Sequence, residues 1–139
     1  MKKTLFISLV TITLAACSAR NTTHYYSIES VLNSAEAKTI VDPNIQLYFA
    51  QPAPGKVIIA DAVTNKKTNF ANKSDQKGCN WAFLSAVKQL QERAKSEGAT
   101  KVGNIVSYYK KKTYASPTNF ECHAGHIIGG VALKGDIVK

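Results

Sequence analysis

The stretch GCNWAFLSAVKQLQERAKSEG, residues 78–98, predicts one amphipathic helix on which the rest of the chain depends. Its apolar residues recur at intervals of three and four positions, which places them on one side of a helix. Gly98 is a typical stop signal, because glycine readily takes the left-handed conformation that ends a helix. A one-sided apolar stripe must be buried against another layer. The stripe consists of Phe83, Leu84, Val87, Leu90 and Ala94.

Two cysteines stand at places that matter for this helix: Cys79 at its start and Cys122 far along the chain. As a disulfide they would close a loop of about 44 residues, which is worth about 4 kcal/mol of unfolding free energy if chain entropy dominates. As free thiols, Cys79 would gain reactivity from its place at the helix N-terminus. The compartment decides between the two states.

The first 16 residues, MKKTLFISLVTITLAA, have two lysines followed by an apolar run too short to span a bilayer comfortably. This pattern predicts an export signal. Residues 14–17, Leu-Ala-Ala-Cys, resemble the lipobox of bacterial lipoproteins. The resemblance implies cleavage before Cys17, a diacylglycerol on its sulfur and an acyl group such as palmitate on its new amino terminus, which together anchor a protein stably. Ser18 is not acidic, which suggests transfer to the outer membrane; the alternative is an ordinary secretory peptide.

Lipidation of Cys17 would leave an even pair of cysteines in an oxidising periplasm, where a disulfide between Cys79 and Cys122 is the default. The full chain has 18 basic and 9 acidic side chains. Loss of residues 1–16 removes two lysines and no acid, which leaves 16 basic side chains against 9 acidic ones and a net charge of +7. We expect a signal peptide at residues 1–16, a lipidated tether at 17–29 and a single domain at 30–139.

The order of elements predicts an α+β fold, with one main helix packed on a small, mainly antiparallel sheet of about four strands and stapled by one disulfide. Alternating apolar residues or β-branched runs mark the strands, and turn residues separate them. The expected elements are a short helix at 30–41, strands at 45–50 and 57–63, the main helix at 78–98, and strands at 101–113 and 120–133.

Cys79, the helix end at residues 94–99 and the ending Cys122…Gly129-x-x-Ala132-Leu133 resemble the Rcs envelope-stress-sensing outer-membrane lipoprotein family. Proteins of that family carry two disulfides, one of which joins the start of the helix to the final strand. Cys79 and Cys122 match those two positions. Tyr108 and Ile128 occupy the places of the second bridge, so the resemblance implies that these two side chains pack against each other across the sheet.

Three further segments resemble small exported bacterial proteins that are often labelled as excinuclease ATPase subunits. The chain is far too short for such an ATPase and lacks a phosphate-binding G-x-x-x-x-G-K-[ST] loop. That family has no assigned biochemical activity, so the resemblance implies only fold and compartment. The segments are LQERAKSEGA at 90–99, NIVSYYKKK at 104–112 and ECHAGHIIGGVALKGDIV at 121–138.

A basic run beside an aromatic residue, Tyr109-Lys110-Lys111-Lys112, is the first candidate contact surface. It could bind phosphates of lipopolysaccharide, nucleic acid or acidic glycans. Alternatively, its lysines protect a sheet edge from pairing with another chain. Trp81 lies off the apolar stripe, so it either packs under a loop or serves as an anchor for a partner.

Cys79, Cys122 and His126, with His24 as a further ligand, are the only metal candidates, and a disulfide would remove both thiolates from this set. The chain has no C-x-x-C motif and no evident catalytic pair of acids. We therefore expect a non-enzymatic outer-membrane lipoprotein without a cofactor, which binds an envelope protein or senses the state of the envelope. The alternatives are a cationic module that binds polyanions and, less favoured, a thiol- or metal-dependent enzyme.

Overall fold

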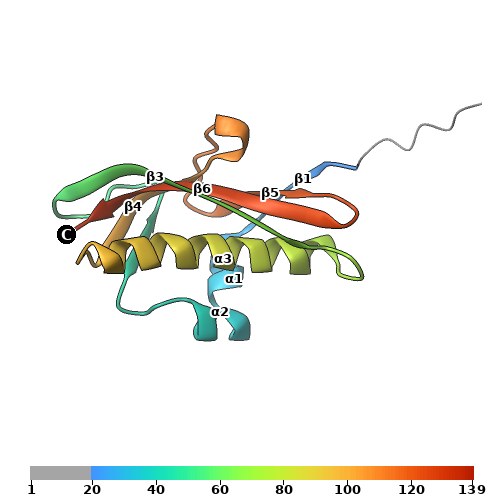
Figure 1. Ribbon diagram of the computed structural model, residues 1–139, viewed down its shortest axis with the longest axis horizontal. Coiled ribbons are helices and arrows are strands. Elements are labelled where there is room, and N and C mark those ends of the chain that lie inside the picture. Colours follow the sequence, from blue (N-terminus) through green and yellow to red (C-terminus); the bar gives the residue numbers. More distant parts are fainter. Residues whose placement is uncertain (1–19) are drawn as a thin grey trace, which may run out of the picture.

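The computed structural model describes residues 20–139 and has an α+β fold, in which the helices lie on one side of a curled, mixed sheet (Figure 1). The predicted signal peptide, Cys17 and the start of the predicted tether lie outside these residues. None of the helices in the described part of the chain has the length and apolar character that crossing a membrane requires.

The main helix, α3, runs from Asp75 to Ser96, and its predicted apolar stripe is buried. It begins three residues before the predicted start because Ser74 caps it: the Ser74 hydroxyl accepts a hydrogen bond from the backbone N–H of Lys77 at 3.1 Å. Gly98 follows the end of the helix with a φ of +70°, as its predicted role as a stop signal requires. The prediction of this helix is thus confirmed, with an earlier start.

Strand β6 (Ile128–Val138) is the centre of the sheet, which has six strands rather than about four. Strand β3 (Val57–Asn69) pairs with it along one edge, and β4 (Lys101–Ser107) and β5 (Asn119–Ala124) share the other edge. Strand β1 (Thr22–Ser27) lies outside β5, and β2 (Gln46–Phe49) lies outside β4 and runs parallel to it. All other pairings are antiparallel, so the sheet is mainly antiparallel, as predicted.

Three predicted strands have clearly different bounds. The strand expected at 57–63 continues to Asn69 as β3, because residues 64–69 pair with β6. The strand expected at 120–133 is divided into β5 and β6 by a turn that begins at Gly125, whose N–H donates to the carbonyl oxygen of Ile128 at 3.0 Å. The strand expected at 101–113 ends at Ser107, and the chain then leaves the sheet through the short 3-10 helix η1 (Tyr109–Lys111).

Part of the segment expected as a tether at 17–29 belongs to the fold. Residues 22–27 of the expected tether form β1 and pair with β5 along their whole length, and Ile28 is buried in the core at 5% exposure. The single helix expected at 30–41 is two helices, α1 (Ile28–Leu32) and α2 (Ala35–Ile40). They separate because the Ser34 hydroxyl accepts from the backbone N–H of Ala37 and starts a new helix.

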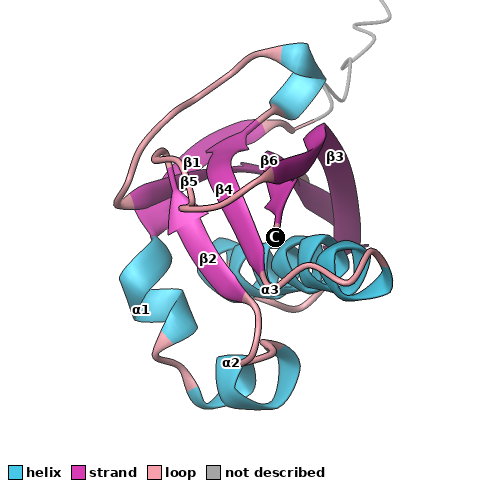
Figure 2. Ribbon diagram, turned by 90° about the vertical axis from the view of Figure 1, so that its left-hand side faces the viewer, coloured by secondary structure: helices cyan, strands magenta, loops and turns pink. Residues whose placement is uncertain are grey.

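The core lies between α3 and the sheet, and α1 and α2 lie on the same side of the sheet as α3 (Figure 2). Stacked aromatic rings fill its middle: the ring centroids of Phe83 and Phe120 are 4.2 Å apart. Phe70 closes one end. Its ring lies so close to Gly78 of α3 and Gly129 of β6 that a Cβ at either position would approach it within 2.6 Å and 2.5 Å, respectively. Both glycines are therefore needed for the helix and sheet to meet here.

Candidate functional site

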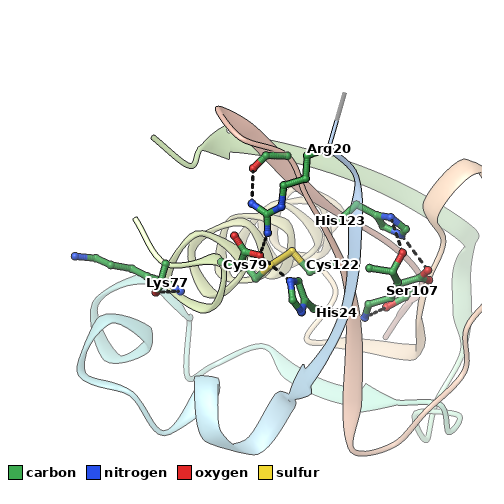
Figure 3. Close-up of a disulfide and its surroundings, with 12 residues drawn as sticks. Arg20, His24, Lys77, Cys79, Ser107, Cys122 and His123 are labelled. Carbon is green, nitrogen blue, oxygen red and sulfur yellow. Dashed lines mark hydrogen bonds and ion pairs between the residues drawn. A yellow bond between two sulfur atoms is a disulfide. The ribbon is translucent and has the colours of Figure 1, made fainter. Parts of the chain in front are cut away.

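The disulfide joins Cys79 in the first turns of α3 to Cys122 of β5, with 5.8 Å between the Cα atoms (Figure 3). Both side chains are 0% exposed. The predicted pairing is confirmed, although the strand that it reaches is the penultimate one, since the predicted last strand is divided in two. Each sulfur is bonded to the other, so neither thiolate serves as a nucleophile or metal ligand while the bridge is intact.

A cluster of charged side chains on the N-terminal segment covers one side of this bridge. His24 lies opposite Cys122 in the pairing of β1 with β5, and its Nε2 is 2.8 Å from Oδ2 of Asp75, the first residue of α3. The Arg20 guanidinium also donates to Oδ2 of Asp75 (Figure 3). Arg20 and His24 thus both contact the Asp75 carboxylate, and these contacts hold the edge strand β1 against the start of α3.

The electrostatics of this cluster follow from the same contacts. The hydrogen bond from Arg20 holds the pKa of Asp75 below its usual value, and the bond to His24 adds to the effect. Burial raises the pKa of Tyr26, and the negative charge of Asp75 raises it further. The lowered pKa keeps the Asp75 carboxylate charged at neutral pH, and at 21% exposure its side chain is partly shielded from water.

A second cluster lies on the face of the sheet that points away from α3. His123 alternates with Cys122 along β5, so its ring faces away from the disulfide, and its Nε2 is 2.9 Å from Oε1 of Glu121. Its Nδ1 is 3.3 Å from the hydroxyl of Thr23 on β1. The Tyr109 ring stacks on the imidazole with 3.4 Å between centroids. This stack holds η1 against the sheet.

The basic run stands on this stack. Lys110 and Lys111 have φ values of 50° and 61°, which turn the chain sharply, and Lys110, Lys111 and Lys112 are all exposed. The interpretation that these lysines protect a sheet edge is wrong, because they follow β4 in η1 and the turn after it instead of lying along an edge strand. They are free to contact a partner.

Further aromatic and basic side chains extend this surface. Tyr25 is 51% exposed, and its ring lies 4.7 Å from that of Tyr114. The ammonium of Lys134 lies 4.5 Å from the centre of the Tyr108 ring. We call this set the tyrosine–lysine surface; it consists of Tyr25, Tyr108, Tyr109, Tyr114, Lys110, Lys111, Lys112 and Lys134.

Sequence reasoning found only part of the tyrosine–lysine surface. The run at 109–112 was visible as a pattern, whereas the contribution of Tyr25 depends on the pairing of β1 with β5. In the sequence, only the adjacency of Tyr25 and Tyr26 hints that the two side chains point to opposite faces of a strand. Which face Tyr25 occupies depends on the pairing of β1 with β5.

The arrangement of Ser107, His123 and Glu121 does not match a hydrolytic triad. The Ser107 hydroxyl accepts a hydrogen bond from the backbone N–H of Glu121 at 2.9 Å, and the residue is only 3% exposed. A catalytic serine must reach its substrate and give its proton to the histidine. Here the serine oxygen instead supports the backbone of β5.

Trp81 lies on another part of the molecule and is 37% exposed, which leaves it open to a partner, one of the two alternatives predicted for it. It lines a surface pocket of about 410 Å³ between α2 and α3, together with Glu36, Lys77, Asn80 and Leu84. The side-chain oxygen of Asn80 is buried and has no hydrogen-bond partner among residues 20–139.

The remaining predicted ligands do not converge. His126 lies in the exposed turn after β5, whereas His24 contacts Asp75. Within residues 20–139, no three His, Cys, Asp or Glu side chains are grouped so that they could hold a metal ion.

The expected contact between Tyr108 and Ile128 does not form. The backbone N–H of Tyr108 donates to Ala132, four residues further along β6, and Ile128 pairs with Asn69 of β3. Four residues of a strand span about 13 Å. The two side chains are therefore separated along β6, and Ile128 is 59% exposed.

Comparisons with protein-family models, with curated proteins and with solved structures found no match for the chain. Its own geometry is therefore the basis for a functional argument. That geometry separates the predicted contact residues: Tyr109 and the lysines at 110–112 lie beyond the outer face of the sheet, and Trp81 lies on α3.

Proposed function

We propose that this protein is a non-enzymatic lipoprotein of the outer membrane, anchored by acyl chains on Cys17, whose domain binds an envelope protein or senses the state of the envelope. The observation that carries the proposal is the buried bridge between Cys79 and Cys122. It uses the two cysteines that remain after lipidation of the third. An intact structural disulfide is typical of an exported protein, in agreement with the predicted signal.

The outer face of the sheet supports a binding role. Tyrosine side chains give large contact areas at a low entropic cost, and they are frequent at binding surfaces. The tyrosine–lysine surface presents several of them beside exposed ammonium groups, on a sheet held rigid by the disulfide and the core. By contrast, the Ser107 hydroxyl beside His123 and Glu121 is buried and accepts a hydrogen bond from the backbone, so it is not accessible to a substrate.

Lipidation and the partner can be tested in the same cells. The wild-type protein should incorporate radiolabelled palmitate and sediment with outer membranes, whereas the Cys17→Ser variant should do neither. A photo-crosslinking amino acid at Tyr25 should capture one envelope protein, and the same group at Ser85, on α3, should not. Absence of palmitate from the wild-type protein would contradict the proposal.

Binding of polyanions is a second candidate function, favoured by the position of Lys110, Lys111 and Lys112 on the Tyr109–His123 stack. Such binding should weaken steeply with salt, because each bound phosphate releases counterions. The triple alanine variant at 110–112 should reduce the slope of log affinity against log salt by about 2 to 3 for a nucleic-acid probe. The matched control removes the same charge elsewhere, with alanine at the exposed positions Lys38, Lys56 and Lys95.

Lipopolysaccharide and heparin serve as further probes in the same titration. An affinity that does not change between low and moderate salt would rule out this second function.

A further inference from the structure

The hairpin of β5 and β6 carries two adjacent exposed isoleucines, one in its turn and one at the start of β6. Ile127 is 65% exposed and Ile128 is 59% exposed, the highest values among the large apolar side chains of residues 20–139. His126 beside them is also exposed. We call residues 126–128 the hairpin tip. Apolar side chains that project in this way from the end of a fold suggest contact with another apolar phase.

The hairpin tip is held firmly in place by its neighbours. The backbone N–H of Phe70 donates to the carbonyl oxygen of Ile127 at 2.6 Å, and the N–H of Gly125 donates to that of Ile128 at 3.0 Å. The Phe70 ring is itself packed between Gly78 and Gly129. The isoleucines therefore project from a rigid support, so their exposure is a property of the folded domain.

The N-terminal segment leaves the domain beside this tip. Thr22 pairs with Ala124 at the end of β5, and a guanidinium nitrogen of Arg20 lies 3.4 Å from the carbonyl oxygen of Gly125. Figure 1 shows the chain leaving at the same end of the molecule as the hairpin between β5 and β6, opposite the C-terminus. Cys17 precedes Arg20 by three residues, which reach about 10 Å at most.

Basic side chains surround the tip. Arg20 lies against the turn, Lys67 pairs with Gly130 of β6, and Lys73 belongs to the loop that follows Phe70. Asp75 near this end forms an ion pair with Arg20, so these two charges offset each other, and the net positive charge near the tip comes from Lys67 and Lys73. Exposed apolar side chains next to basic side chains favour binding to the interface of a membrane that contains anionic lipids.

We propose that the hairpin tip inserts into the interface of the phospholipid bilayer that holds the acyl chains of Cys17, with Lys67 and Lys73 against the lipid phosphates. This inference rests on the proposed anchoring. The short reach from Cys17 keeps the tip next to the bilayer, so its local concentration at the surface is high. The hairpin tip then points toward the bilayer, and the tyrosine–lysine surface lies to the side of the domain, where a partner can reach it.

The test measures the depth of a single tryptophan in the lipidated, full mature protein. Trp81 is the only tryptophan of the chain, so Trp81→Phe provides a silent background. Ile127→Trp reports on the tip. Val57→Trp is the matched control, because Val57 is an exposed apolar residue at 46% that pairs with Val138 at the opposite end of the domain. The protein is reconstituted in vesicles of phosphatidylethanolamine and phosphatidylglycerol with bromine on the acyl chains.

We expect the emission of Ile127→Trp to fall by about half in brominated vesicles, because a side chain buried roughly 5–10 Å in the interface lies close to the brominated acyl chains. The emission of Val57→Trp should stay unchanged. Mass spectrometry of the same samples measures the acyl chains. An acylated protein in which neither tryptophan is quenched overturns the inference and leaves the proposed anchoring intact. This outcome is expected if the hairpin tip contacts a protein partner and not the bilayer. A mature protein without acyl chains overturns both.

Discussion

Removal of the bridge, by reduction or by C79A/C122A, should cost the protein a large part of its stability. The cysteines are 43 residues apart, so the bridge closes a loop whose entropy in the unfolded chain corresponds to about 4 kcal/mol. Domains of ordinary size are stable by about 5–15 kcal/mol, so the reduced protein should be only marginally folded. At about 4 °C per kcal/mol for a domain of this length, the melting temperature should fall by roughly 15 °C.

Urea unfolding of the oxidised and reduced wild-type proteins isolates the loop contribution, because reduction leaves both sulfur atoms in place. C79A/C122A also removes two buried sulfurs and should therefore be less stable than the reduced wild type. Trp81 fluorescence and circular dichroism give two independent readings of the transition. The urea dependence of the unfolding free energy should rise without the bridge, since the unfolded chain then exposes more surface.

The same bridge predicts a kinetic result. Both side chains are 0% exposed, so a mild reductant should not open the disulfide in the folded protein, and reduction should speed up only as urea populates unfolded chains. The reasoning would be refuted by a reduced protein within about 1 kcal/mol of the oxidised one, because chain entropy would then contribute little.

Three further predictions concern packing, charge and a buried amide. Gly129→Ala should destabilise the protein by about 1–3 kcal/mol, because a Cβ there would lie 2.5 Å from the Phe70 ring; thermal unfolding would show it, and an unchanged melting temperature would contradict the close packing. Arg20 holds the pKa of Asp75 low, so the carboxylate contributes stability above its unfolded pKa of about 4, and this contribution is lost as pH falls through the lower folded pKa. As the pH is lowered from about 5 through the titration of Asp75, the urea midpoint should therefore fall less steeply for Asp75→Asn than for the wild type, and equal slopes would exclude the contribution. Gln91→Ala should cost about 3 kcal/mol in urea unfolding, because the 2% exposed amide makes three hydrogen bonds to the backbone of the loop before β2, and a change below that of an exposed glutamine would refute its role.

The amphipathic helix and the pairing of Cys79 with Cys122 could be predicted because each has a strong local signal. Apolar residues that recur every three to four positions mark the buried face of a helix at any place in a chain. The cysteine pair followed from counting, once Cys17 was assigned to the lipid. The general α+β arrangement followed from the order of such local patterns.

The bounds of the sheet could not be predicted in the same way. Residues 22–27 form β1 although the segment TTHYYS is polar and has no aliphatic residue, because its backbone pairs with β5 about a hundred residues later. Gln91 lies on α3 among polar neighbours, and its burial depends on the loop that crosses it. Neither contact leaves a periodic trace in the sequence.

The sequence by itself determined which helix is amphipathic and where it ends, since these follow from the spacing of residues along one segment. Together with the predicted lipidation of Cys17, the number of cysteines also indicated which two sulfurs join. Only the tertiary structure decided that Tyr109 stacks on His123 and that Arg20 lies against the turn at Gly125. These contacts join residues 14 and 105 positions apart, and they arise from strand register. Register is set by the pairing of whole strands, which no single segment specifies.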